Sequence, residues 1–85
     1  MAKAYKILAA ARNNPEGVAL SDLRKLVLAA GFAHKRTDGS HEVYGRKDVP
    51  EVVGLQPRKH DKRMAKIYQV RQVVDIIDKY KIEVT

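Results

Sequence analysis

The sequence contains no cysteine and no long run of apolar residues. Without cysteine, disulfide bonds and thiolate metal sites are excluded, and the redox compartment stays undetermined. A membrane-spanning helix needs roughly 20 consecutive apolar residues, and no segment approaches that length, so no membrane partner is expected. Internal repeats and low-complexity segments are also missing. The 85 residues therefore predict one domain, 1–85, with a modest core.

Sequence patterns that bind metals are missing as well. The three histidines, His34, His41 and His60, show no H-x-x-x-H spacing, and no cluster of carboxylates accompanies them. The sequence therefore predicts neither a metal site nor a cofactor.

Negative charge is scarce relative to positive charge. The chain has 17 Lys and Arg against 10 Asp and Glu, a formal net charge of +7. Such an excess in a small domain favours partners that are rich in phosphate. Many basic side chains fall between residues 56 and 66, where Asp61 is the only acidic residue. This segment has few apolar residues, so it is predicted to be an exposed basic loop with almost no apolar anchor.

Three helices are predicted from the spacing of apolar residues. The first covers residues 3–13 and ends at Asn13–Gly17. The second begins with Ser21 as its N-cap and ends at Gly31, a C-cap glycine. The last runs from about residue 67 to 81.

Between the second and the third helix the pattern alternates with a period of two, which indicates strands. Strands are predicted at 32–36, 40–44 and 51–55, with a turn at Asp38-Gly39 and a loop at 45–50. The order α-α-β-β-β-α predicts an α+β domain in which a three-stranded antiparallel sheet packs on helices. Two helices are expected to cover one face of the sheet and to leave the other face open.

His41 is the leading candidate for a catalytic residue. It follows the turn and lies near many cations, and histidine is the side chain best suited to proton exchange near neutral pH. A metal-free ribonuclease needs one group to remove the proton of a ribose 2′-OH, another to protonate the departing 5′-oxygen, and cations at the phosphate. His41 can serve as acid or base, and the 2′-OH restricts this chemistry to RNA. Spacing alone also allows a surface histidine without a role.

Other side chains are candidates for contacts with RNA. The candidate RNA-binding residues are Lys35, Arg36, Ser40, Arg58, Lys59, His60, Lys62, Arg63 and Lys66. Tyr44 and Tyr68 can stack on bases, although tyrosines at such positions more often serve packing. His34 is placed to pair across the hairpin, and Ser40 is also expected to cap the turn.

Five segments carry a more specific signal: Ser21-Asp22-Leu23-Arg24-Lys25-Leu26, Ala30-Gly31-Phe32, Gly39-Ser40-His41, Leu55-Gln56-Pro57 and Tyr68-Gln69-Val70-Arg71-Gln72-Val73. In this order they resemble the HicA toxin family. The similarity covers residues 21–81 as the core, and residues 1–20 would form an additional N-terminal helix and linker.

The resemblance implies a fold like a small double-stranded-RNA-binding domain and the activity of a ribosome-independent mRNA interferase from a bacterial toxin–antitoxin pair. It implies that His41, the histidine of the Gly-Ser-His motif, is catalytic. It also implies mRNA as substrate, a HicB-like antitoxin protein as partner and a cytoplasmic location. Two other classes remain open: a non-catalytic RNA-binding module that uses the same basic face, and a structural or regulatory subunit whose charge serves a partner protein.

Overall fold

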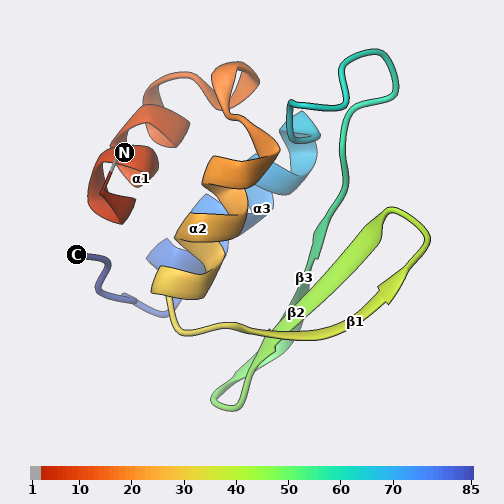
Figure 1. Ribbon diagram of the computed structural model, residues 1–85. Helices are drawn as coiled ribbons and strands as arrows, with labels where there is room; N and C mark the ends of the chain where they lie inside the picture. The colour runs from red at the N-terminus through yellow and green to blue at the C-terminus, as the bar shows by residue number, and fades with distance from the viewer. Residues whose placement is uncertain (1–2) are drawn as a thin grey trace.

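Three α-helices, one short 3-10 helix and three strands make up the part of the chain that the structure describes, residues 3–85 (Figure 1). The elements of this computed structural model are α1 (Ala4–Asn13), η1 (Pro15–Gly17), α2 (Leu20–Ala29), β1 (Ala33–Asp38), β2 (His41–Arg46), β3 (Val49–Leu55) and α3 (Ile67–Lys79). The protein is therefore α+β with the order α-α-β-β-β-α, and this confirms the fold class predicted from the sequence.

The three strands form an antiparallel sheet in the order β1-β2-β3. The α-helices lie on one side of this sheet, where α2 and α3 contact β3 and α1 packs on α2 and α3 (Figure 1). Two hydrogen bonds from Arg12 to Asp78, at 2.7 and 2.5 Å, join α1 to α3. No helix among residues 3–85 lies over the opposite face, which we call the open face of the sheet.

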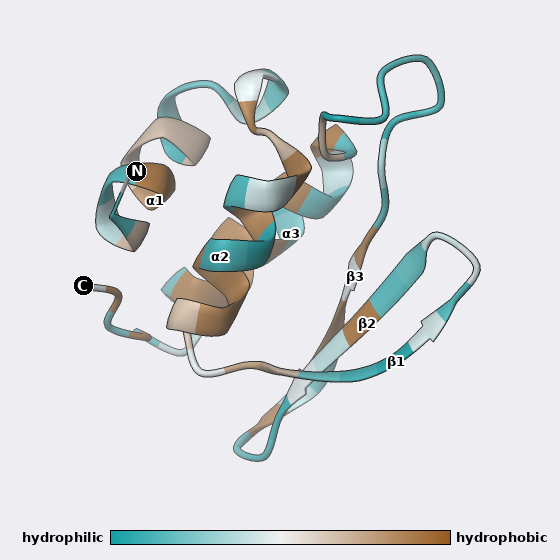
Figure 2. Cartoon of the chain, viewed as in Figure 1, coloured by the Kyte–Doolittle hydropathy of each residue, from teal (hydrophilic) through white to brown (hydrophobic). Residues whose placement is uncertain are grey.

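The core lies between the helices and the covered face of the sheet. Its fully buried side chains include Leu23 and Leu26 of α2, Val53 and Leu55 of β3, and Val70 of α3. Figure 2 shows the same arrangement as apolar stretches on α2 and β3, while β1 and the loop before α3 are mostly hydrophilic. Burying one such side chain stabilises the fold by roughly 1.5–3 kcal/mol. Packing therefore holds α3 in place although its valines are poor helix formers.

Helix α2 ends as predicted. Gly31 has a φ of +90°, and the N–H of Phe32 donates to the carbonyl of Val27 at 3.2 Å, which is the pattern of a Schellman motif. Helix α3 ends at Lys79, slightly before the predicted end, and Lys81 takes up a positive φ of 51° after it. Glycine thus predicts a helix end well, whereas an end without glycine is harder to place.

The start of α2 differs from the prediction. Ser21 is not the N-cap, because Ala19 holds that position and the helix begins at Leu20. The N–H of Leu20 donates to the carbonyl of Arg63 at 2.8 Å. A backbone donor at the start of α2 is therefore bound by the distant loop that contains Arg63, whereas the sequence had suggested the local side chain of Ser21 as the cap.

The β1–β2 turn consists of Gly39 and Ser40, one residue later than predicted. Asp38 pairs with His41 across the hairpin, which leaves two residues in the turn. Gly39 comes first in the turn and has a φ of +60°, as a type II′ turn requires of its first central residue. Asp38 is therefore the last residue of β1, and β2 begins directly at His41.

The loop predicted at residues 45–50 is wrong. β2 extends to Arg46 and β3 begins at Val49, so only residues 47 and 48 connect them. Pro50 is compatible with β3 because β3 is an edge strand, paired only with β2. Side chains of α3, which lies beside β3, reach the open face next to Val52 and Gly54, and this matters for the site described next.

Candidate functional site

His41 lies half-buried on the open face of the sheet, at the first position of β2. The register pairs Val43 with Gly54, so His41, Val43 and Gly54 share this face. The imidazole lies against the backbone of Gly54, where an added Cβ atom would overlap Nε2 of His41. The missing side chain at position 54 therefore provides the space that the imidazole occupies.

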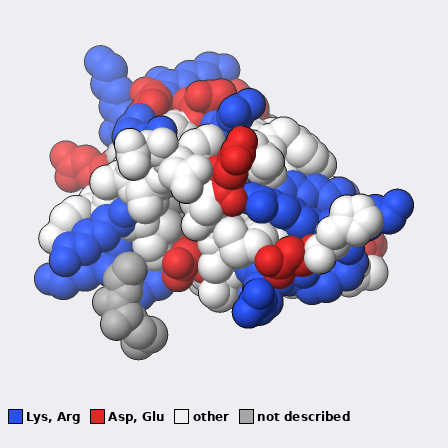
Figure 3. Space-filling model, turned by 90° about the horizontal axis from the view of Figure 1, so that it is seen from above, with Lys and Arg blue, Asp and Glu red and all other residues white. Residues whose placement is uncertain are grey.

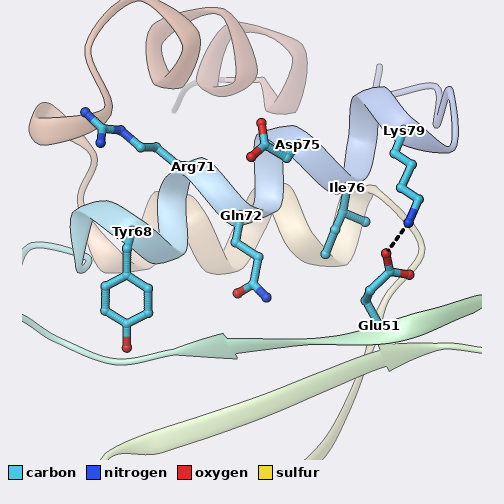
Figure 4. Close-up of a pocket in the computed structure, with 7 residues that line it drawn as sticks. All are labelled: Glu51, Tyr68, Arg71, Gln72, Asp75, Ile76 and Lys79. Carbon is cyan, nitrogen blue, oxygen red and sulfur yellow. Dashed lines mark hydrogen bonds and ion pairs between the residues drawn. The ribbon is translucent and has the colours of Figure 1, made fainter.

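A hollow of about 280 Å³ adjoins His41 where the sheet meets α3. Its lining residues are Arg36, His41, Val43, Val52, Gly54, Tyr68, Gln69 and Gln72. Tyr68 and Gln72 point from α3 toward the sheet (Figure 4). The hollow thus brings together an imidazole, a guanidinium, a phenol and two carboxamides. Of these groups, imidazole is the one suited to proton exchange near neutral pH.

Arg36 brings positive charge next to His41. It lies on β1 opposite Val43 and therefore on the same face. Its Nε is 3.1 Å from a carboxylate oxygen of Asp38, and both side chains are largely exposed, at 67% and 71%. An ion pair this exposed contributes about 0–1 kcal/mol to the stability of the fold, so Arg36 can leave Asp38 and bind a phosphate at little cost in free energy.

Glu42 follows His41 in the chain but lies on the covered face, toward α2. Arg24 donates two hydrogen bonds to its carboxylate, at 2.9 and 2.7 Å, and the hydroxyl of Tyr44 donates another at 2.6 Å. The hydrogen bonds from Arg24 lower the pKa of Glu42 to about 2, while burial acts in the opposite direction. This negative charge is therefore neutralised by Arg24 and separated by the sheet from the face that carries His41.

Tyr44 and His34 belong to the covered side of the hairpin as well. Tyr44 is only 3% exposed, and burial raises its pKa. Tyr44 therefore serves packing, the role that tyrosines at such positions more often have, and is not accessible for stacking on a base. His34 pairs with Tyr44 in register, as expected, and the two rings meet edge to face at 5.5 Å between centroids. Nε2 of His34 is 2.6 Å from Oγ1 of Thr37, so His34 takes no part in the hollow of His41.

The basic loop, residues 56–66, is anchored. The backbone N–H of Arg58 donates to the carbonyl of Met64 at 2.8 Å, and its Nε donates to the carbonyl of Ala65 at 2.7 Å. Its Nη2 also donates to the carbonyl of Glu16. Ala65 is fully buried in the core. The expectation of a loop with almost no apolar anchor is therefore wrong, and structural hydrogen bonds occupy the guanidinium of Arg58.

Part of the basic loop borders the hollow of His41. Lys59 and Lys66 line a second hollow, of about 440 Å³, together with Arg58, Ile67, Tyr68 and Arg71. Tyr68 lines both this basic hollow and the hollow of His41. The hollow lined by Lys59 and Lys66 therefore adjoins the hollow of His41 at Tyr68.

The other part of the loop lies beside the start of α2. Lys62 and Arg63 line a third hollow, also of about 440 Å³, that includes Arg24. The backbone N–H of Arg63 donates to Asp61 at 3.1 Å, whereas its guanidinium approaches Asp61 only to 3.5 Å and its side chain is 90% exposed. Figure 3 shows lysine and arginine side chains at the left, the top and the right of one face of the molecule, with acidic side chains between them. The loop therefore offers two groups of accessible cations and not one continuous row.

Three other candidates lie outside these hollows. Lys35 sits at the irregularity of β1, where its side chain runs along Gly45. Ser40 lies exposed in the turn, and His60 lies exposed in the basic loop. Their contacts with RNA stay predictions.

Sequence reasoning missed Gly54, which the register of β2 and β3 places beside His41. It also missed Arg71 and Gln72, because only the packing of α3 beside β3 brings them to the site. The side chain of Gln69 helps to fix this arrangement, since its Oε1 accepts a hydrogen bond from the N–H of Gln56 at 2.7 Å. One available signal was the spacing of Tyr68 and Gln72, which lie one helical turn apart outside the apolar face of α3.

No group of three His, Asp or Glu side chains within residues 3–85 is arranged to hold a metal ion. Over the same residues, none of the helices has both the length and the apolar character that crossing a membrane requires. Comparison with known proteins finds no matching family model, no matching curated protein and no matching solved structure. What the site can do therefore has to be inferred from its own side chains.

Proposed function

We propose that this protein is a HicA-like endoribonuclease that cleaves mRNA with His41 as general acid or base. The observation that carries this proposal is the position of His41, in a hollow with Arg36 and next to the basic hollow of Lys59 and Lys66. An imidazole beside accessible cations suits a reaction at a phosphodiester. The Gly39-Ser40-His41 motif and the other segments shared with the HicA family support the same activity.

The proposed reaction is a transesterification within the RNA. The ribose 2′-OH loses its proton, its oxygen attacks the adjacent phosphorus, and the bond from phosphorus to the 5′-oxygen breaks. The 5′-oxygen takes up a proton and leaves, and a 2′,3′-cyclic phosphate remains on the other fragment. His41 performs one of the two proton transfers, and Arg36 stabilises the negative charge that builds on the phosphate oxygens.

The biological setting follows from the resemblance. The protein would be the toxin of a toxin–antitoxin pair in the cytoplasm, where its mRNA substrate is found. A HicB-like antitoxin would neutralise it by covering the open face of the sheet and the basic loop. Acidic side chains on the antitoxin would complement the accessible cations Lys59, Lys62 and Arg63.

The experiment compares induced expression of the wild type, His41→Ala and the control His34→Ala. His34 is also a histidine of this hairpin, but it lies outside the hollow of His41. We expect the wild type and His34→Ala to stop growth and degrade RNA, and His41→Ala to do neither while remaining folded. The purified wild type should cleave RNA in the presence of excess chelator and leave cyclic phosphate ends.

Undiminished cleavage by a folded His41→Ala protein would remove His41 from the mechanism. Fragments with 5′-phosphate ends, or full inhibition by chelator, would contradict the proposed reaction. Loss of cooperative unfolding in His41→Ala would assign His41 a structural role.

One observation favours the alternative of a non-catalytic RNA-binding module. Among residues 3–85, those that line the hollow of His41 include no second histidine and no carboxylate that could perform the other proton transfer. An RNA-binding module would use the same hollow and the same cations. Tight RNA binding by a purified wild-type protein that leaves the RNA intact would favour this alternative.

A further inference from the structure

Tyr68 is the most exposed of the large apolar side chains, at 61%. It lies in the first turn of α3 and lines the hollow of His41, the basic hollow and a hollow of about 350 Å³ along α3 (Figure 4). The ring of Tyr68 therefore does not pack in the hydrophobic core. Its location where three hollows meet points to contact with a ligand that extends through more than one of them.

The other tyrosines near the sheet are committed to contacts within the protein. Tyr44 is buried and donates to Glu42, and the hydroxyl of Tyr80 donates to Glu51. Tyr68 has only a long contact, 3.4 Å, between its hydroxyl and Nε2 of Gln69. Because Tyr68 is 61% exposed and its hydroxyl makes no close contact, its ring is accessible to a flat partner.

Charge on the two sides of Tyr68 suggests what that partner is. On one side Lys59, Lys66 and Arg71 line the basic hollow, and on the other side Arg36 and His41 line the second hollow. A chain with regularly spaced negative charges and flat groups between them matches this alternation of cation, aromatic ring and cation. Single-stranded RNA has that pattern, because its unpaired bases are free to stack.

We propose that Tyr68 is the stacking platform for one nucleobase of single-stranded RNA, next to the phosphate that faces His41. This inference rests on the proposed ribonuclease function and names a subsite of it. Lys59, Lys66 and Arg71 hold the phosphate on the far side of the stacked base. The amide of Gln72, which points the same way as Tyr68, lies within the same hollow and is available to hydrogen-bond the base edge.

The test measures binding of a fluorescein-labelled single-stranded RNA of about 12 nucleotides to the His41→Ala protein, which does not consume the RNA. Into this background we place Tyr68→Ala, Tyr68→Phe and, as a matched control, Tyr5→Ala. Tyr5 is also exposed, at 47%, but it lies on α1. Tyr68→Ala should weaken binding about tenfold or more, and Tyr68→Phe and Tyr5→Ala should stay within about twofold.

Salt dependence separates stacking from phosphate contacts. Tyr68→Ala should leave the slope of log K against log salt unchanged, because no phosphate contact is lost. Lys59→Gln and Arg71→Gln should each reduce the slope by about 0.7, the value for one contact to single-stranded nucleic acid. Thermal unfolding of each variant verifies that the protein remains folded, and Tyr68→Leu provides a second variant that keeps an apolar side chain.

The outcomes distinguish this inference from the proposed function. If the parent protein binds RNA and Tyr68→Ala and Tyr68→Leu bind it equally well, the stacking subsite is overturned and the ribonuclease proposal stands. If both substitutions weaken the binding of duplex RNA as strongly as the binding of single-stranded RNA, Tyr68 does not stack on an unpaired base. If the parent protein binds no RNA at all, both proposals fail.

Discussion

At the scale of single residues, Gly54 and His41 depend on one another. The imidazole of His41 occupies the space that a side chain at position 54 would fill. Gly54→Ala should therefore displace the imidazole and lower the rate of RNA cleavage by roughly tenfold to a hundredfold, because small displacements of reacting groups are costly. The free energy of unfolding should change by less than about 1 kcal/mol. Single-turnover cleavage and urea unfolding measure the two effects.

Gly45→Ala is the matched control for Gly54→Ala. Gly45 is also a strand glycine, but a Cβ atom there would meet the flexible side chain of Lys35, with Cε at 3.0 Å. Cleavage by Gly45→Ala should remain close to that of the wild type. Equal activity of the Gly54→Ala protein would show that the position of the imidazole is not set by Gly54.

Glu42 contributes to stability in a way that depends on pH. Its folded-state pKa is about 2, below the ordinary value of 4.5 for a glutamate. The contribution is therefore present above pH 4.5 and is lost as the pH falls toward 2. Because Arg24 is 38% exposed, solvent screens the pair, and we expect a loss of about 1 kcal/mol in the free energy of unfolding.

Urea unfolding across this pH range tests the expectation. Glu51 also has a pKa lowered to about 2 by Lys79, so the wild type should lose stability from both groups. Glu42→Gln should be less stable than the wild type at pH 6 and should lose less on acidification, whereas Glu83→Gln, at an exposed position, should follow the wild type. Parallel curves for wild type and Glu42→Gln would contradict a role for Glu42 in acid sensitivity.

At the scale of elements, the basic loop combines a structural cation, Arg58, with the cations proposed to bind RNA. Arg58→Ala removes the donors to the carbonyls of Ala65 and Glu16, so we expect the free energy of unfolding to fall by about 1–3 kcal/mol. Joint neutralisation of Lys59, Lys62 and Arg63 to Gln should leave stability within about 0.5 kcal/mol. The same triple variant should reduce the salt slope of RNA binding by about two units.

Urea unfolding and RNA titrations at several salt concentrations measure these effects. Arg58 is not included in the triple variant, because its loss is expected to destabilise the fold, and weaker RNA binding could then result from unfolding. An unchanged affinity and salt slope in the triple variant would show that the loop does not contact RNA, and an acidic antitoxin surface would then be the better partner for it.

Local chemistry decided which elements were predictable. The end of α2 was predictable from Gly31, because the positive φ that ends the helix there depends mainly on the presence of glycine. Gly39 located the hairpin but not its register, since glycine suits more than one turn position. The start of α2 was misplaced because its first donor is bound by Arg63, a residue far away in the sequence.

At the scale of the whole molecule, α1 is part of the core. Ile7 is 4% exposed and belongs to the same buried cluster as residues of α2, β3 and α3. Ile7→Ala should lower the free energy of unfolding by about 2–4 kcal/mol. Tyr5→Ala, on the exposed side of the same helix, should change it by less than about 0.5 kcal/mol. Similar small effects for both would mean that α1 is a dispensable addition.

The candidate site was only partly predictable for a related reason. His41 and Arg36 lie close in sequence and belong to the same predicted hairpin, so the sequence was enough to name both as candidates, whereas their shared face comes from the observed register. Tyr68 and Gln72 reach the same hollow from α3, through the packing of that helix beside β3. Pattern and charge identify residues that lie near one another in the chain, whereas they do not reveal which distant helix forms the other wall of a hollow.

That wall has a consequence for the order of events during synthesis. The hairpin with His41 leaves the ribosome well before α3, and α3 supplies Tyr68 and Gln72 to the hollow. A nascent or prematurely terminated chain that ends before residue 67 has the histidine without the surface that would orient RNA against it. Under the proposed function, completion of the last helix would therefore act as a safeguard, because the protein would cleave mRNA only after its own translation had reached α3.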